Sequence, residues 1–262
     1  MTVYRYELRR SAKSFLIWSF SVGALALMCM LLYPSLQSQV ATISDSFSEM
    51  GGFTAAFGMD VLNLGTLMGF YGIECGTCLG LGGGLYAAFT ASGLLSGEEL
   101  GHTAEFLYTH PLSRVRILTE KFAAFLTQLL AFNGVWVLCA LAGFAYAGEA
   151  PAWKAFWLFQ LAQLFLQAEI GAVCFLLSAF AGRGALGGGI GVMAAFYTLS
   201  LWGNISEKVD FVRFLTPYWY ADASRVLPDA SIDGGLLALS LCVAAASFLA
   251  ALLYYDRRDI GA

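Results

Sequence analysis

Six long apolar runs, separated by shorter polar stretches, dominate the pattern of this 262-residue chain. The runs lie at 15–33, 69–95, 122–147, 155–180, 185–202 and 235–255. Each is close to the roughly 20 residues that an α-helix needs to cross the hydrocarbon core of a bilayer. A transmembrane β-barrel would alternate apolar and polar residues instead. The pattern therefore predicts an all-α integral membrane protein with six transmembrane helices.

Composition supports this fold class and limits the possible partners. The chain is 59% hydrophobic and 12% charged, whereas an average soluble domain is about a quarter charged. The first apolar run is too long for the core of a cleavable signal peptide, so we expect it to remain as a membrane anchor. The net charge of -4 carries little information, and no basic cluster indicates nucleic-acid binding.

The N-terminal residues 2–14 combine a basic stripe with an apolar face, which is typical of an amphipathic interfacial helix. The basic stripe consists of Arg5, Arg9 and Lys13. The apolar face, which can contact lipid, consists of Tyr4, Leu8 and Phe15. A plain basic flank before the first span is the open alternative.

Two further segments, 34–68 and 203–233, are expected to be helical and to lie outside the cell. Pro34 is expected to end the first span. An apolar stripe at steps of three and four then predicts an amphipathic helix. The stripe consists of Leu36, Val40, Ile43, Phe47, Met50, Phe53 and Phe57. In the second segment, the aromatic cluster 218–220 is expected at the membrane interface.

Small residues recur on one face of two predicted spans, which favours close helix packing in a membrane. In the second span these include Gly72, Gly76, Gly80 and Gly84. In the fifth span they include Gly187 and Gly191.

The distribution of Lys and Arg predicts the orientation. With six spans, both termini and the loop between spans two and three share one side. That side carries ten basic residues: Arg5, Arg9, Arg10, Lys13, Arg114, Arg116, Lys121, Arg183, Arg257 and Arg258. The opposite side carries four: Lys154, Lys208, Arg213 and Arg225. The positive-inside rule places the richer side in the cytoplasm, so we expect cytoplasmic N- and C-termini in a cell membrane.

The polar stretch 96–121 lies on this cytoplasmic side and predicts a short helix. Ser96 and Glu99 have the spacing of a capping box. Thr103, Phe106, Leu107 and His110 then share one helix face. Pro111 is expected to end this helix, and Ser113 to cap the next one. An exposed apolar helix face of this kind favours docking into a groove of a partner.

The same stretch resembles the signature that follows the second span in permeases of the type-2 export class of ABC transporters. The matching residues are Glu98–Glu99, Gly101, Thr103, Glu105–Phe106–Leu107, Pro111, Ser113–Arg114 and Lys121. His102 intervenes between Gly101 and Thr103, which departs from the commonest form. The basic start and the six spans extend the resemblance over nearly the whole chain, 1–262, as a single transmembrane permease domain.

The resemblance implies a function. Residues 96–113 would form a cytoplasmic coupling helix that docks on a separate ABC ATP-binding subunit. Its contact residues would be Glu98, Glu99, Thr103, Glu105, Phe106, Leu107, Pro111 and Arg114. Two permease chains would pair through the small faces of the second or fifth span. The chain has no Walker A sequence, so we expect no cofactor and no catalysis in it, with ATP and Mg on the partner. The cargo would be a small amphiphilic or hydrophobic molecule, a peptide or a lipid.

Two alternatives remain open. An ATP-independent channel or ion-coupled transporter would use polar groups within the spans, and the candidates are Glu169, Gln163 and Gln167 in the fourth span. A membrane metalloenzyme would use Glu99 and His102, which are spaced as a metal-binding pair. The chain has only two histidines, so we assign no metal-binding residue.

Overall fold

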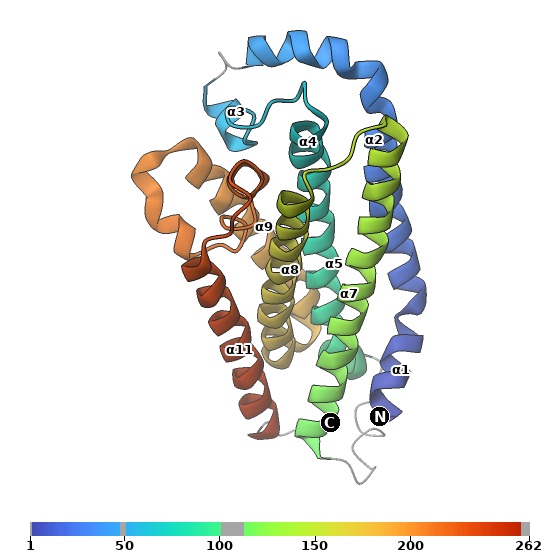
Figure 1. The fold of residues 1–262 in the computed structure, drawn as a ribbon. Coiled ribbons are helices and arrows are strands. Elements are labelled where there is room, and N and C mark those ends of the chain that lie inside the picture. The colour runs from blue at the N-terminus through green and yellow to red at the C-terminus, as the bar shows by residue number, and fades with distance from the viewer. Residues whose placement is uncertain (1, 48–50, 101–112, 258–262) are drawn as a thin grey trace.

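A computed structural model of the chain describes residues 2–47, 51–100 and 113–257, and its regular elements in these ranges are all helical (Figure 1). Six of the described helical stretches are long and apolar enough to cross a membrane. They are Ala12–Gln37, Leu67–Gly97, Arg114–Ala147, Trp153–Ala181, Ala185–Ile205 and Gly234–Tyr255. The prediction of an all-α protein with six candidate spans is confirmed.

The helices follow one another in an up-and-down order. They are α1 (Thr2–Arg10), α2 (Ala12–Phe47), α3 (Gly52–Ala56), α4 (Leu67–Phe70), α5 (Gly76–Leu100), α7 (Arg114–Ala147), α8 (Trp153–Ala181), α9 (Ala185–Ile205), α10 (Ala223–Val226) and α11 (Gly234–Arg257). A π-helical turn, η1 (Tyr71–Cys75), joins α4 to α5. Two 3-10 segments, η2 (Gly182–Gly184) and η3 (Glu207–Phe214), flank α9.

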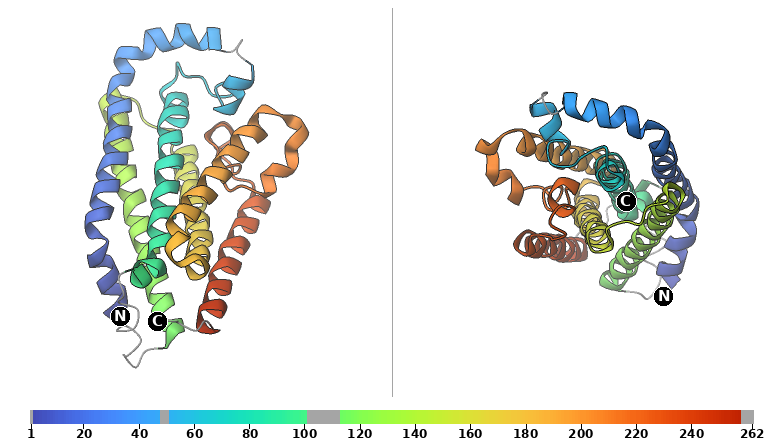
Figure 2. Two further views of the ribbon diagram at one scale, coloured as in Figure 1. Left: turned by 180° about the vertical axis from the view of Figure 1, so that it is seen from behind. Right: turned by 45° about the horizontal axis from the view of Figure 1, so that its top comes forward.

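Helices α5 and α8 form the centre of the bundle and are the most buried of the candidate spans. They pack against each other, with α11 on one side of α8 and α9 against both (Figures 1 and 2). Helices α2 and α7 pack together on the other side. The start of α1, the end of α5, the start of α7 and the end of α11 share one end of the bundle.

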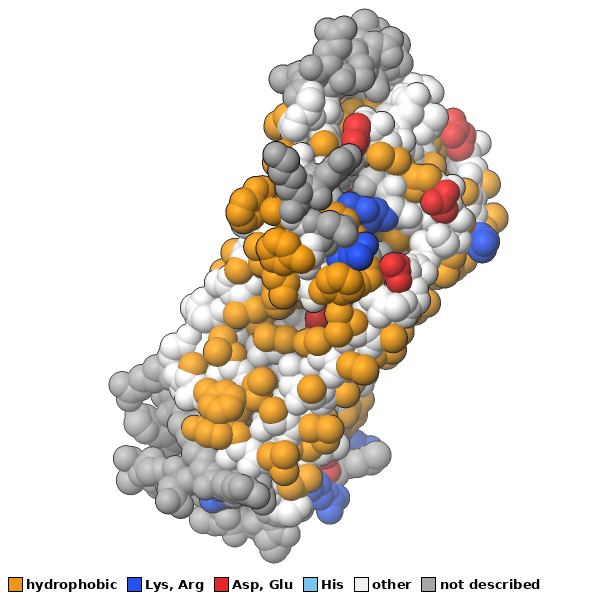
Figure 3. All heavy atoms as spheres, turned by 90° about the vertical axis from the view of Figure 1, so that its left-hand side faces the viewer, with side chains coloured by type: hydrophobic (Ala, Val, Ile, Leu, Met, Phe, Trp, Pro, Cys, Tyr) orange, Lys and Arg blue, Asp and Glu red, His pale blue; other side chains and the backbone are white. Residues whose placement is uncertain are grey.

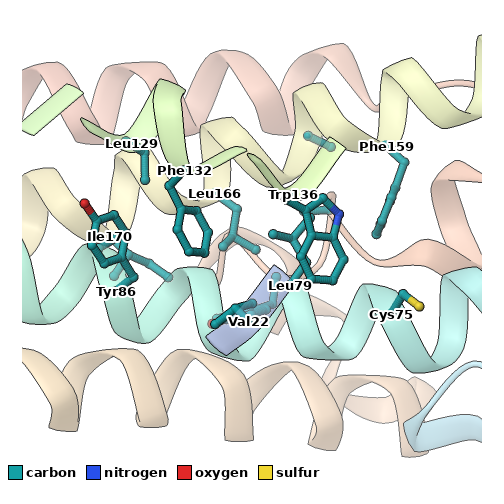
Figure 4. Packing of buried hydrophobic residues seen from close by; sticks show 14 of the residues in the cluster. Val22, Cys75, Leu79, Tyr86, Leu129, Phe132, Trp136, Phe159, Leu166 and Ile170 are labelled. Atoms are coloured by element: carbon teal, nitrogen blue, oxygen red, sulfur yellow. The ribbon is translucent and has the colours of Figure 1, made fainter. Parts of the chain in front are cut away.

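Aromatic side chains fill much of the core. Tyr86 of α5 stacks on Phe132 of α7 with 4.7 Å between ring centroids. Figure 4 shows these residues together with Trp136 of α7 and Phe159 of α8. Hydrophobic side chains are spread over the middle of the face seen in Figure 3, while most charged side chains lie toward its ends. An apolar exterior of this kind suits contact with lipid chains.

The first predicted span does not end at Pro34. Helix α2 continues through Pro34 to Phe47 and bends across one end of the bundle in its second half (Figure 1). A proline removes one backbone donor and bends a helix, but the hydrogen bonds of the other residues can carry the helix onward. The predicted single amphipathic helix after Pro34 is also divided, because Gly51 has a φ of 56° and α3 starts anew at Gly52.

The predicted helix start at Ser96 is wrong. Helix α5 runs through this position to Leu100, and the Ser96 hydroxyl donates to the carbonyl of Ser92, one turn earlier, at 2.6 Å. Ser96 is also buried, so its side chain serves the packing of α5 and does not cap a new helix. The prediction for Ser113 is confirmed, because its hydroxyl accepts from the Arg116 amide at 3.4 Å and α7 begins at Arg114.

The N-terminal helix lies along α7. The Tyr4 amide donates to Glu120 at 3.2 Å, and the Tyr4 hydroxyl lies 3.0 Å from the Thr127 hydroxyl. Tyr4 was expected to face lipid and instead contacts α7. The basic stripe Arg5, Arg9 and Lys13 is exposed as predicted.

Candidate functional site

A row of buried glutamines on α8 forms a polar layer inside the bundle. Gln160 donates to the hydroxyl of Tyr71 in η1. Gln163 donates to the carbonyl of Ala221 at 2.9 Å. Gln167 accepts from Asn133 of α7 at 2.7 Å. Because α8 lies at the centre of the bundle, the polar groups on its buried face need hydrogen-bond partners from neighbouring segments. These hydrogen bonds link α8 to η1, to α7 and to the segment that contains Ala221.

Several polar atoms of this layer have no hydrogen-bond partner among the described residues. They are Gln160 Oε1, Gln163 Oε1, Gln167 Nε2 and Asn133 Oδ1. An unsatisfied polar group costs free energy in an apolar interior. The layer can therefore accept water or polar groups of a ligand.

A cavity of about 60 Å³ adjoins Gln163, between α5, α8, α9 and the segment after η3. Polar groups of Thr77, Tyr197, Asn204 and Asp222 contribute to its lining. Ligand sites for small molecules usually occupy about 300–1,000 Å³. The cavity has room for a few waters but not for such a ligand.

The segment 216–227 covers the part of the bundle that contains this cavity. The Tyr218 hydroxyl donates to the carbonyl of Gly80 at 2.9 Å, and the Thr216 hydroxyl donates to the carbonyl of Phe196 at 2.8 Å. Tyr218 and Tyr220 are buried. Their predicted place at a membrane interface is wrong, because their rings fill the space between helices and their hydroxyls find partners there.

A second polar network holds the rim of the cavity. Asp222 accepts from the Ser224 amide and from Asn204, both at 2.8 Å. Arg225 donates to Asn204 at 3.1 Å, and its guanidinium lies 3.6 Å from the centre of the Trp219 ring. These contacts connect α9 to the segment 216–227.

The small face of the second span is covered by the chain itself. A Cβ at Gly72 would lie 2.5 Å from Leu227, and one at Gly76 would lie 3.0 Å from Phe159. Gly80 and Gly84 approach Tyr218. The prediction that a second permease chain packs on this face is wrong, because these four glycines admit α8 and the segment 216–227 instead.

The small face of the fifth span is uncovered in this chain. Gly187 and Gly191 of α9 are exposed, and a Cβ at either position would meet nothing within 4 Å among the described residues. Packing of another helix at these two positions stays a prediction.

Glu169 lies apart from the glutamines, on the side of α8 that faces α11. The Ser240 hydroxyl lies near its carboxylate and 2.9 Å from the hydroxyl of Tyr220. One carboxylate oxygen, Oε2, has no hydrogen-bond partner within the described residues. The structure therefore does not bring the three residues predicted to line a pathway into one site: Gln163 and Gln167 share the polar layer, and Glu169 does not.

A buried ionic cluster lies at the opposite end of the bundle. Lys121 of α7 is fully buried; its ammonium donates to Glu7 of α1 at 2.7 Å and to the carbonyl of Leu94 of α5 at 2.8 Å. The guanidinium of Arg10 lies 3.8 Å from the same Glu7 oxygen. The cluster thus joins α1, α5 and α7 next to the predicted coupling loop.

Most of the predicted coupling residues lie outside the described part of the chain. Thr103, Glu105, Phe106, Leu107 and Pro111 belong to 101–112, as do both histidines of the metalloenzyme alternative. Glu98 and Glu99 lie in the last turn of α5. Arg114 begins α7 and donates to the carbonyl of Tyr255 at 3.2 Å, which connects α7 to the end of α11.

Sequence reasoning missed Glu7, although a signal was present. Glu7 is the one acid in an otherwise basic segment, Thr2–Lys13. A lone carboxylate on a basic helix needs a partner if that helix packs against others. The i,i+3 spacing of Glu7 and Arg10 on one helix could have indicated their pairing. Lys121 could not be assigned to Glu7 from the sequence, because the two meet only when α1 lies along α7.

A bundle of six apolar helices with a buried polar layer defines a multi-pass membrane protein. The profile of the family described as ABC-2 family transporter protein matches residues 1–260, so the chain belongs to this family. It is accordingly a transmembrane transport subunit of the ABC-2 permease type. A comparison with curated proteins gave no match.

Proposed function

We propose that the chain is the permease subunit of an ATP-driven exporter in the cell membrane, coupled through residues 96–113 to a separate ATP-binding subunit. The observation that supports this proposal is the family match over residues 1–260, together with the signature residues after the second span. ATP and Mg would bind the partner, because the chain has no Walker A sequence. Its N-terminus, C-terminus and coupling loop would face the cytoplasm.

The contacts around the loop suit the transmission of motion. The ionic cluster of Glu7, Arg10 and Lys121 fastens α7 to α1 and α5. The bond from Arg114 to Tyr255 fastens α7 to α11. A push on the segment between α5 and α7 would therefore move four helices together, and packed helices of this kind shift as rigid bodies.

The polar layer on α8 is the proposed route for cargo. Gln163 and Gln167 offer amide groups inside an apolar bundle, and segment 216–227 closes the layer toward the outside. To open the polar layer toward the outside, α5 and α8 would have to separate from segment 216–227. Polar groups set in apolar walls suit an amphiphilic or hydrophobic small molecule, a peptide or a lipid.

Reconstitution with the ATP-binding subunit tests the coupling. Charge inversion of Glu98, Glu99 and Glu105 to Lys should abolish stimulation of ATP hydrolysis and transport, while insertion and melting temperature stay at wild-type values. Glu149→Lys is the matched control, because Glu149 is exposed in the loop at the other end of α7. Survival of coupling after the triple inversion would show that the loop assignment is wrong.

The same reconstitution separates the alternatives. Transport that follows an ion gradient and does not need the ATP-binding subunit would favour an ATP-independent channel or an ion-coupled transporter. Activity that requires a bound metal and is lost on substitution of His102 would favour the metalloenzyme.

The second permease chain is proposed to pack on α9. Gly187→Cys should form a disulfide-linked dimer under mild oxidation in membranes, since this face is exposed. Gly84→Cys should not, because Gly84 lies against Tyr218 inside one chain. A dimer through Gly84 alone would contradict the assignment.

A further inference from the structure

A second cavity lies near the ionic cluster, between the N-terminal helices and α5. Its volume is about 180 Å³, three times that of the cavity beside Gln163. Its lining includes Arg10, Ser14, Phe15, Phe89, Thr90 and Gly93. None of them belongs to the polar layer on α8 or to the predicted coupling loop.

One part of this cavity is apolar and continuous with the outer surface of the bundle. Phe15 and Phe89 line it, and Phe89 is 40% exposed. Trp18 packs beside Phe89, with 6.3 Å between ring centroids. The exposed part of Phe89 therefore connects this side of the cavity to the outer surface of the bundle, where an acyl chain can enter.

The other part of the cavity is polar. Glu7 and Arg10 line it, with the hydroxyl-bearing residues Ser14 and Thr90. Lys121 pairs with Glu7 at 2.7 Å, whereas the guanidinium of Arg10 lies 3.8 Å from the same oxygen and can also bind an anion. The guanidinium of Arg10 also lies against α5, because a Cβ at Gly97 would be 2.9 Å from its Nη2 atom.

Arg10 supplies a cation to the lining of this cavity. Arg5 and Arg9 are exposed on the same helix, but they lie on the face of α1 roughly opposite Glu7 and do not line the cavity. A basic residue near a bilayer surface attracts the headgroup of an anionic lipid.

We propose that this cavity binds one anionic phospholipid, with its phosphate at Arg10 and the hydroxyls of Ser14 and Thr90, and with one acyl chain on Phe15 and Phe89. The lipid would hold α1 and α2 against α5, beside the ionic cluster. The proposal does not depend on the direction of transport or on the cargo.

Native mass spectrometry of the purified full-length chain tests this proposal, with phosphatidylglycerol and phosphatidylcholine as probes. The wild type should retain one phosphatidylglycerol in preference to phosphatidylcholine. Arg10→Gln should weaken this preference about fivefold, the effect of one basic residue near the headgroups. Arg9→Gln is the matched control, because Arg9 lies on the same helix but does not line the cavity.

Filling the cavity gives an independent measurement. A Cβ at Gly93 would meet nothing within 4 Å among the described residues, so Gly93→Leu can occupy the cavity without disturbing the helices. This variant should lose the bound lipid and keep a wild-type melting temperature in detergent. Gly134→Leu, at an equally open position on α7, should keep the lipid.

Three results would overturn the proposal. They are retention of phosphatidylglycerol by Gly93→Leu, equal retention of both lipids by the wild type, and displacement of the lipid from Arg9→Gln as readily as from Arg10→Gln. Inorganic phosphate should not displace the lipid, and displacement at millimolar phosphate would mean that the site binds the anion alone. If Gly93→Leu melts early, Gly93→Ala and Gly93→Val provide a graded series in which lipid loss must follow side-chain volume.

Discussion

The buried ion pair between Glu7 and Lys121 should be the most sensitive electrostatic contact of the fold. Its two atoms are 2.7 Å apart, with exposed fractions of 5% and 0% for the two side chains. At an effective dielectric constant of about 20, the attraction at this distance is about 6 kcal/mol, and the loss of hydration offsets much of it. Removing one partner of a buried pair leaves an uncompensated charge and costs about 3–5 kcal/mol.

The two single variants should differ in how much stability they lose. Glu7→Gln removes the carboxylate that Lys121 and Arg10 share, so it leaves two neighbouring cations and should reach the upper end of that range. Lys121→Met leaves Glu7 with Arg10 at 3.8 Å, so it should lie near the lower end. The double variant should be more stable than Glu7→Gln alone, because it leaves one cation instead of two.

The free energy of unfolding, measured by SDS titration in mixed micelles, checks this order. Arg116→Gln is the control, because Arg116 forms a 3.1 Å pair with Glu120 on the same helix but is 58% exposed. Exposed pairs contribute about 0–1 kcal/mol, so this control should change stability little. A loss for Glu7→Gln no larger than that of the control would refute the reasoning, as would a larger loss for Lys121→Met than for Glu7→Gln.

Two other variants test packing and the role of the acid on α8. Gly171→Ala should destabilise the bundle by about 1–3 kcal/mol in the same titration, because the added methyl would overlap the buried ring of Phe125. Gly134→Ala is the control; it adds a methyl at an open position and should be neutral or stabilising. Glu169→Gln should preserve ATP-driven transport in proteoliposomes, because an amide has nearly the same size and Glu169 lies apart from the polar layer of Gln163 and Gln167. Loss of transport together with its pH dependence would instead support the ion-coupled alternative.

Much of the fold was readable from the chain because membrane helices obey a simple rule. Without water in the hydrocarbon core, each span must satisfy its own backbone hydrogen bonds, so long apolar runs become helices. The six predicted runs therefore coincide with six of the described helices. Their ends were less certain, as Pro34 and Ser96 show, because one residue's local preference does not decide where a long helix stops.

The candidate site was only partly predictable. The glutamines of α8 were visible as polar residues in an apolar run, and Gln163 and Gln167 do lie in one buried layer. Glu169 was grouped with them because it shares their span, although a 3.6-residue repeat already places it roughly opposite Gln160. The structure places it toward α11, since a central helix is buried on opposite faces and one span can serve two separate polar networks.

The aromatic cluster 218–220 illustrates the same limit. Tyrosine is amphipathic, so its presence at a predicted span boundary is compatible with either a membrane interface or a packed core with a hydrogen-bonded hydroxyl. The chain near Tyr218 does not distinguish these cases. The contact with Gly80 does, and it joins residues 138 positions apart.

The sequence by itself determined the class of protein, the number of candidate spans and the family signature, because hydropathy and short motifs are local properties. Only the tertiary structure decided that the glycine face of α5 is filled by α8 and the segment 216–227, and that Glu7 meets Lys121. Both depend on contacts between distant segments. Packing and charge pairing in a bundle are set by which helix faces meet, and that choice is not encoded in any one helix.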